Sequence, residues 1–171
     1  DPPSVVSTHL TETIRNHAFE LLGRQETKQL VDHLAQTYPI LVEEITPNPL
    51  SIGDVQKVLS KLLKERVSIR NLPIIFETLA DYGKLTTDTD LLTEYARQAL
   101  ARQITSQYAM EGTLKVVTLS GAYEKTIADA IEQTEHGTYL SLSPESSQQI
   151  VNAVGHELEQ ASMQGISPVI L

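Results

Sequence analysis

Histidine, glutamate and serine are the residues of this chain that could do chemistry, and their spacing decides whether they can. His9 and His17 lie eight positions apart, so on a helix rising 1.5 Å per residue they are separated by roughly 12 Å, too far for one metal ion. His156 and Glu157 match the start of the zinc-protease motif His-Glu-x-x-His, but Gln160 stands where the second histidine is needed. We therefore expect no metal site and assign these histidines to helix surfaces and helix packing.

The other patterns that support catalysis are also incomplete. Glu43 and Glu44 are adjacent and point apart on a helix, so they do not form an acid/base pair. Ser120 and Gly121 join an expected strand to an expected helix without the further glycines and the lysine of a phosphate-binding loop. No serine lies in a Gly-x-Ser-x-Gly motif, and the absence of cysteine excludes thiol catalysis and Cys-ligated zinc. We expect no enzyme activity, no cofactor and no metal.

Composition places the chain among soluble proteins. No apolar run approaches the ~18 to 20 residues that cross a bilayer, and the residues from Asp1 onward lack the features of a signal peptide. The net charge of -9 opposes binding to nucleic acid. The apolar residues 167–171 are typical of a buried strand, where a natural terminus is rare, so we interpret the chain as a fragment.

Through the first hundred residues, apolar side chains recur every three or four positions, which predicts amphipathic helices. The expected helices cover residues 4–22, 25–37, 51–65, 71–82 and 87–108, and a short turn is expected at 40–45. Ser51 is expected to cap its helix, with Asp54 three residues on. Asn71 is expected to cap the next helix, with Pro73 in its first turn.

After Gly112 the pattern changes to alternating strands and helices. Strands are expected at residues 114–119, 138–142 and from 168 onward, and helices at 121–135 and 144–164. The predicted fold class is a multi-subdomain α plus α/β protein, in which an all-helical subdomain precedes a small, truncated α/β subdomain with a parallel sheet. The junction is expected within residues 105–113.

Arg24, Gln25 and Glu26 form a charged turn directly after a helix-stopping glycine. Two interpretations remain open for this turn, a capping cluster or a docking contact. Acidic residues at helix starts are favoured for local reasons, so capping is the preferred interpretation.

Several strings of the first hundred residues resemble the FlhA family of flagellar biosynthesis proteins, which are export-gate proteins. The matching strings lie at residues 4–10, 17–26, 30–34, 55–59, 67–71, 77–81 and 91–104. Beyond Gly112 the similarity rests on the order of strands and helices and on residues 167–171. Gly23-Arg24-Gln25-Glu26 is similar to the flagellar branch, because the branch of virulence-type secretion systems commonly has isoleucine at the Arg24 position.

The resemblance implies the cytoplasmic domain of a bacterial inner-membrane protein, composed of four subdomains and assembled as a nine-membered ring beneath the export channel. On that basis residues 1–21 form the closing helix of a preceding subdomain and residues 22–104 the all-helical subdomain. Residues 105–171 form the α/β subdomain, truncated at its carboxyl end. The resemblance also makes the junction at 105–113 a candidate hinge.

The partners implied by the resemblance are flagellar export chaperone–substrate complexes, other export-apparatus proteins and further copies of the protein in the ring. Thr8 matches a residue of the chaperone-binding pocket of the family, most of which precedes Asp1. A purely structural role for Thr8 stays open, because a helical threonine can hydrogen-bond a preceding carbonyl. The alternative functions are an export gate of a virulence-type system, a helical adaptor unrelated to secretion, and a small enzyme in the α/β half.

Overall fold

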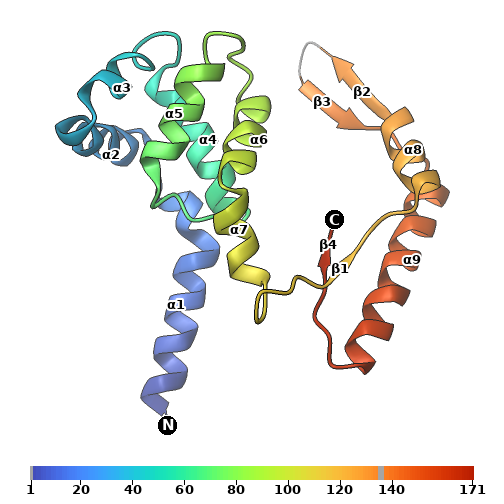
Figure 1. The fold of residues 1–171 in the computed structure, drawn as a ribbon. Helices are drawn as coiled ribbons and strands as arrows, with labels where there is room; N and C mark the ends of the chain where they lie inside the picture. The colour runs from blue at the N-terminus through green and yellow to red at the C-terminus, as the bar shows by residue number, and fades with distance from the viewer. Residues whose placement is uncertain (1, 135–136) are drawn as a thin grey trace. The chain divides into compact units, whose positions relative to one another are not determined.

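The structure, a computed structural model, describes residues 2–134 and 137–171 (Figure 1). Asp1, Glu135 and His136 lie outside the described residues; Asp1 begins the expected range 1–21, and Glu135 ends the expected helix 121–135. The chain divides into two compact units, residues 1–104 and residues 105–171. We call them the helical unit and the α/β unit and describe each by itself.

The described residues of the helical unit, 2–104, form helices and the turns between them. Its elements are α1 (Pro2–Leu21), α2 (Arg24–Thr37), α3 (Pro39–Glu43), α4 (Ile52–Lys64), α5 (Leu72–Tyr82), α6 (Thr89–Ala99) and α7 (Ala101–Tyr108), the last of which runs across the boundary between the units. The expected helices at 4–22, 25–37, 51–65 and 71–82 are confirmed. The turn expected at 40–45 is wrong for its first part, since residues 39–43 form a short helix and the turn begins at residue 44.

The single helix expected at residues 87–108 is also wrong, because it is interrupted at Leu100. Leu100 has ψ 5°, against about −42° in a regular helix, and its N–H is shared between the carbonyls of Ala96 and Gln98. Its side chain is 1% exposed. The apolar spacing continues across this tight turn, so local periodicity could not reveal the break.

The core of the helical unit centres on α4. Val55, Val58, Leu59 and Leu62 follow the spacing of one helix face, and none of them is exposed. This face packs with the buried side chains of the neighbouring helices, chiefly Val31, Leu34, Ile75, Phe76, Leu79, Leu92 and Ala96. Helix α4 contacts α1, α2 and α6, so it is the element that joins the unit.

The start of α4 is stabilised by a capping box, as expected. The N–H of Asp54 donates to Ser51 Oγ at 3.2 Å, and the N–H of Ser51 donates to Asp54 Oδ2 at 3.0 Å. The cap expected from Asn71 is wrong, because its side chain makes no capping hydrogen bond to α5. Pro73 does lie in the first turn of α5, where its missing N–H is tolerated.

After the end of α7, the described residues of the α/β unit form helices and short paired strands. Its elements are β1 (Val116–Val117), α8 (Gly121–Asp129), β2 (Ile131–Thr134), β3 (Gly137–Leu140), α9 (Pro144–Met163) and β4 (Val169–Ile170). Strands β1 and β4 pair in parallel, with Val116 opposite Val169, which confirms the parallel arrangement. Strands β2 and β3 pair antiparallel.

Two expectations for the α/β unit are corrected. The helix expected at 121–135 ends at Asp129, and Ile131–Thr134 is a strand instead. Those four residues pair with residues 137–140, and this partner is what favours the extended backbone there. The strand expected at 114–119 is shorter, and Val116 is 41% exposed rather than buried.

Among the described residues, no helix is both long enough and apolar enough to span a bilayer.

The capping box predicts a pH-dependent effect of Ser51→Ala. The hydrogen bond from the Ser51 hydroxyl is the largest cause that lowers the pKa of Asp54, against the opposing effect of burial. Because the folded-state pKa is lowered, the stabilisation is present above the unfolded pKa of about 3.9 and is lost as pH falls through the folded value.

We therefore expect Ser51→Ala to lower the free energy of unfolding by about 1 kcal/mol at pH 7 and by less at pH 3. Urea denaturation followed by circular dichroism measures both values. Ser51→Asn, which keeps a capping oxygen, serves as the control. An equal loss at both pH values would show that Asp54 takes no part in the cap.

The central position of α4 predicts a large difference between two leucine substitutions. Leu59 is fully buried and Leu85 is 79% exposed. Leu59→Ala should lower the free energy of unfolding by about 2 to 5 kcal/mol because it leaves a cavity, and Leu85→Ala should change it by less than about 0.5 kcal/mol. Similar losses in the two variants, measured by chemical denaturation, would contradict the placement of the core.

Candidate protein-binding site

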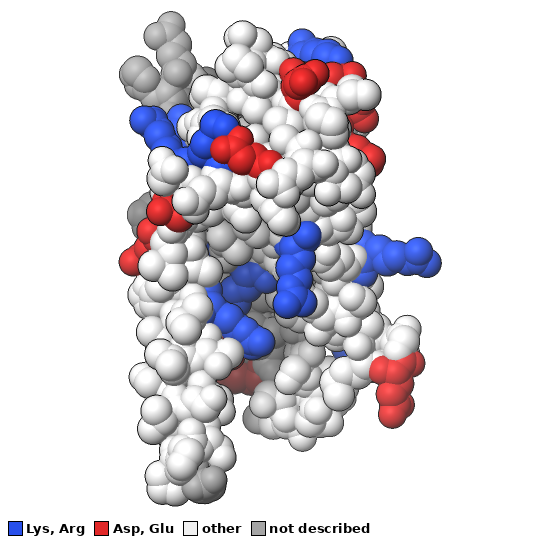
Figure 2. All heavy atoms as spheres, turned by 90° about the vertical axis from the view of Figure 1, so that its left-hand side faces the viewer, with Lys and Arg blue, Asp and Glu red and all other residues white. Residues whose placement is uncertain are grey.

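Thr8 lies in the amino-terminal half of α1, which extends away from helices α2 to α6 (Figure 1). Residues 2–11 are all exposed, and no described side chain of α1 is buried. This segment contains no Lys, Arg, Asp or Glu. Figure 2 accordingly shows this end of α1 as an uncharged surface.

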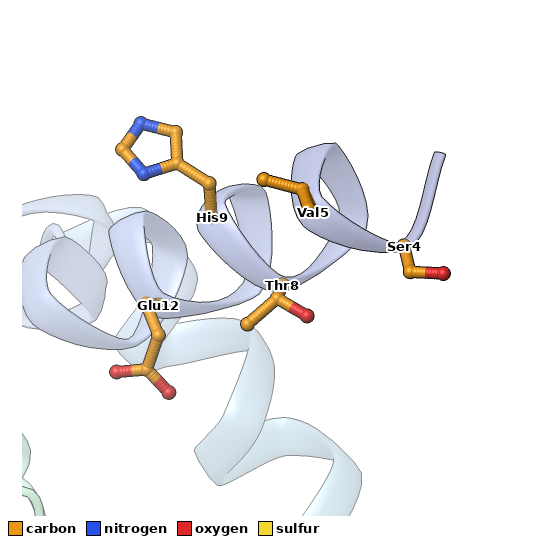
Figure 3. A pocket seen from close by; sticks show the side chains of 5 residues that line it. All are labelled: Ser4, Val5, Thr8, His9 and Glu12. Atoms are coloured by element: carbon orange, nitrogen blue, oxygen red, sulfur yellow. The ribbon is translucent and has the colours of Figure 1, made fainter. Parts of the chain in front are cut away.

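Thr8 and four neighbours on α1 line a shallow hollow (Figure 3). Ser4, Thr8 and Glu12 are spaced by four residues and lie along one line of the helix, with Val5 and His9 on the line beside it. All five residues belong to one helix. The hollow is therefore an open face that a partner could cover, rather than a closed pocket.

The hydroxyl of Thr8 has no hydrogen-bond partner among the described residues. Other helical threonines of the helical unit behave differently: Thr13, Thr27 and Thr78 each donate to the carbonyl four residues earlier, at 2.8 to 2.9 Å. Such a back-bond was the structural alternative for Thr8, and this structure does not have it. The Thr8 hydroxyl is therefore available to an external donor or acceptor.

A line of uncovered apolar side chains runs along the side of α1 opposite to this hollow. Val6, Leu10 and Ile14 are spaced by four residues and are 67%, 58% and 51% exposed. Val5 is 67% exposed as well. Contiguous apolar surface of this kind is typical of a contact with another protein surface. We call residues 4–14 of α1 the α1 face.

The residues that follow the carboxyl end of α1 contact the first turns of α4. Leu22 is 8% exposed, and its carbonyl accepts a hydrogen bond from Gln56 Nε2 at 3.0 Å. The guanidinium of Arg24 lies against Gly53, with its Nη2 3.4 Å from the point where a Cβ would stand. Arg24 also contributes, as a minor cause, to the lowered pKa of Asp54.

These contacts bear on the charged turn at residues 24–26. Gly23 occupies the N-cap position of α2 and has no side chain with which to cap it. The turn is closed by buried Thr27, whose Oγ1 donates to the Gly23 carbonyl at 2.8 Å. In this structure Arg24 therefore serves an intramolecular contact with α4.

The sequence did not single out Arg66, which contacts α1 from the end of α4. The guanidinium of Arg66 donates a hydrogen bond to Asn16 Oδ1, and its Nη2 lies 3.9 Å from Glu12 Oε2. Close by, Lys64 Nζ lies 6.0 Å from the centre of the Phe19 ring. The contacting residues are about fifty positions apart in the chain, and no local pattern links them.

The candidate residues of the α/β unit have local partners. Ser120 caps α8 by accepting the N–H of Tyr123 at 3.4 Å. His156 Nε2 lies 3.2 Å from Gln160 Nε2, the residue that stands in place of a second histidine. In the part of the chain that the structure describes, no three His, Asp or Glu side chains are grouped closely enough to hold a metal ion.

The comparisons with known proteins agree in placing this chain. Residues 1–171 match the FHIPEP family over the whole chain. The flagellar biosynthesis protein FlhA of Bacillus subtilis (strain 168) is 68% identical over 172 residues, which cover all of this chain and 25% of that protein. The chain therefore spans about a quarter of that relative.

Solved structures give the same answer for the fold. The nonameric EscV cytosolic domain from the type III secretion system has a TM-score of 0.78 and 30% identity, covering 97% of this chain and 56% of that one. The complex of Chlamydia pneumoniae CdsV and CdsO has a TM-score of 0.85 and 30% identity, covering 91% and 46%. With the family match over every residue, these similarities show that the chain belongs to the FHIPEP family.

Proposed function

We propose that this chain is part of the cytoplasmic region of a flagellar protein-export gate, a non-enzymatic platform that binds other proteins. The observation that carries the proposal is the 68% identity to the flagellar biosynthesis protein FlhA of Bacillus subtilis, maintained over the entire chain. Identity at this level over a folded region indicates the same role in the same apparatus. The corresponding location is the cytoplasmic domain of a bacterial inner-membrane protein.

An export gate of a virulence-type secretion system is the second candidate. It is supported by the similarity to the EscV cytosolic domain, at 30% identity. The flagellar relative is more than twice as similar by this measure. The Arg24 position also favours the flagellar branch, and Arg24 lies on Gly53 in a contact where a guanidinium fits.

The proposed organisation assigns residues 1–21 to the closing helix of a preceding subdomain, residues 22–104 to an all-helical subdomain and residues 105–171 to an α/β subdomain. The exposed line of Val6, Leu10 and Ile14 on α1 supports the first assignment, because contiguous apolar surface is typical of a contact with another folded surface. The division into compact units at residue 104 supports the other two.

We further propose that the gate binds export chaperone–substrate complexes on the α1 face, with Thr8 in contact with the chaperone. The open hollow around Thr8, the exposed Val5 in it and the unpartnered Thr8 hydroxyl support this assignment. The uncharged character of residues 2–11 favours a contact with the surface of a folded protein over a charged polymer.

Self-association into a ring and contact with other export-apparatus proteins complete the proposal. The support comes from relatives: the EscV domain is described as nonameric, and the CdsV chain was solved in complex with CdsO. A ring requires two different complementary surfaces on each copy, related by a rotation that closes.

A chimera tests the proposed class. We expect Bacillus subtilis FlhA in which this chain replaces the matching residues to restore swimming to a strain that lacks FlhA. A chimera that accumulates at the normal level in the membrane but exports no flagellar protein would contradict the flagellar assignment.

Thr8 provides a separate prediction. In the full-length protein, Thr8→Trp should weaken binding of a purified flagellar chaperone–substrate complex by about tenfold or more, since a bulky ring fills the hollow. Thr8 is exposed, so the variant should melt at the same temperature as the parent. Thr37→Trp, at an exposed position of α2 outside the α1 face, is the matched control. Equal dissociation constants for Thr8→Trp and the parent, measured by isothermal titration calorimetry, would remove Thr8 from the site.

A further inference from the structure

Arg66 stands where a helix of this kind normally ends in glycine. After α4, the N–H of Val67 donates to the Leu62 carbonyl and the N–H of Arg66 donates to the Leu63 carbonyl, both at 2.9 Å. This pair of bonds is the Schellman motif, whose residue between the cap and the returning chain adopts left-handed geometry. Arg66 occupies that position with φ 60°. Glycine reaches this conformation freely, whereas a side chain with a Cβ opposes it.

The left-handed backbone directs the Arg66 side chain into contact with α1. Its guanidinium bonds Asn16 and lies near Glu12, both on the helix that carries Thr8. Apart from half-buried Glu12, Ala18 and Phe19, the side chains of α1 are exposed, so burial gives this helix little support. Arg66 therefore provides a polar contact near the middle of α1, in addition to the hydrogen bond from Gln56 to Leu22 at the carboxyl end of this helix.

We propose that Arg66 is a positioning residue for the α1 face: it sets the direction of α1 relative to the helical unit and so the place of Thr8. Thr8 lies eight residues beyond Asn16, roughly 12 Å along the helix axis. A tilt of about 10° at the Arg66 contact would move Thr8 by roughly 2 Å, more than a preorganised binding site tolerates.

The consequence for chaperone binding rests on the proposed function, but the positioning itself does not. Direction of α1 is a property of this chain and is measured without a partner. The absence of cysteine allows two spin labels to be attached without background, through Thr11→Cys on α1 and Asp81→Cys on α5, both exposed positions. Double electron–electron resonance then gives the distribution of distances between α1 and the helical unit.

Arg66→Gly removes the side chain and suits the left-handed backbone. We expect the melting temperature to stay within about 4 °C of the parent, because relief of the backbone offsets the greater freedom of the unfolded chain. The label at Thr11 lies five residues beyond Asn16, so the same tilt should broaden or shift the distance distribution by roughly 1.3 Å or more. An unchanged distribution in Arg66→Gly would overturn the proposal.

Two further variants separate positioning from general stability. The double variant Glu12→Gln with Asn16→Ala removes the partners of Arg66 and leaves its backbone untouched, so it should reproduce the broadening. Arg66→Lys keeps a cation and should restore part of the narrow distribution. Arg15→Ala is the matched control, because Arg15 pairs with the same Glu12 at 3.2 Å but from within α1. Broadening by Arg15→Ala equal to that of Arg66→Gly would refute a specific role for Arg66.

The effect on chaperone binding is measured with the full-length protein and the purified chaperone–substrate complex. Arg66→Gly should weaken binding by about tenfold, with Arg15→Ala close to the parent. If Arg66→Gly broadens the distance distribution but leaves the affinity for the chaperone–substrate complex unchanged, the direction of α1 does not control binding. The positioning role of Arg66 would then rest on the distance data alone. Unchanged affinity in both Arg66→Gly and Thr8→Trp would instead count against the proposed chaperone site.

Discussion

The buried face of α4 is the constraint on which the helical unit depends. Four side chains at helical spacing, Val55, Val58, Leu59 and Leu62, are fully removed from solvent, and α1, α2 and α6 all contact this helix. Burying an aliphatic side chain contributes on the order of 1.5 to 3 kcal/mol, so this one face accounts for several kcal/mol of the stability of the unit. The ends of α4 are well defined too, by the capping box at Ser51 and by the left-handed turn at Arg66.

Both ends of α4 carry the contacts that attach α1. At the start, Gly53 supports Arg24 and Gln56 bonds the Leu22 carbonyl. At the end, Arg66 reaches Asn16 and Glu12. A left-handed residue other than glycine is less stable by about 1 kcal/mol, and exposed ion pairs return about 0 to 1 kcal/mol. The Arg66 contact thus adds little net stability, which is consistent with a role in orientation.

The candidate site lies on the exposed amino-terminal half of α1, whereas the carboxyl end of α1 is held by contacts with the buried helix α4. Residues 2–11 have no buried side chain and no charge, and they carry Thr8 on one side of the helix and apolar side chains on the other. A surface of this composition matches the apolar centre of a protein interface, where charged residues are depleted. Because α4 is packed in the core, a partner that binds the α1 face acts on a helix whose carboxyl end is held by α4.

The sequence by itself determined four of the helices in the first hundred residues, α1, α2, α4 and α5, because apolar spacing and capping residues such as Ser51 act locally. It also determined the change to an α/β pattern with parallel strands, whereas the pairing of β1 with β4 was seen only in the structure. The tight turn at Leu100, the β2–β3 pair and the contact of Arg66 with Asn16 were decided only by the tertiary structure. The Arg66 contact joins residues 50 positions apart and the turn at Leu100 accompanies burial of its side chain, and residue spacing carries no record of either. The β2–β3 pair joins neighbouring segments, but the pattern of residues 131–134 was compatible with continuation of the preceding helix.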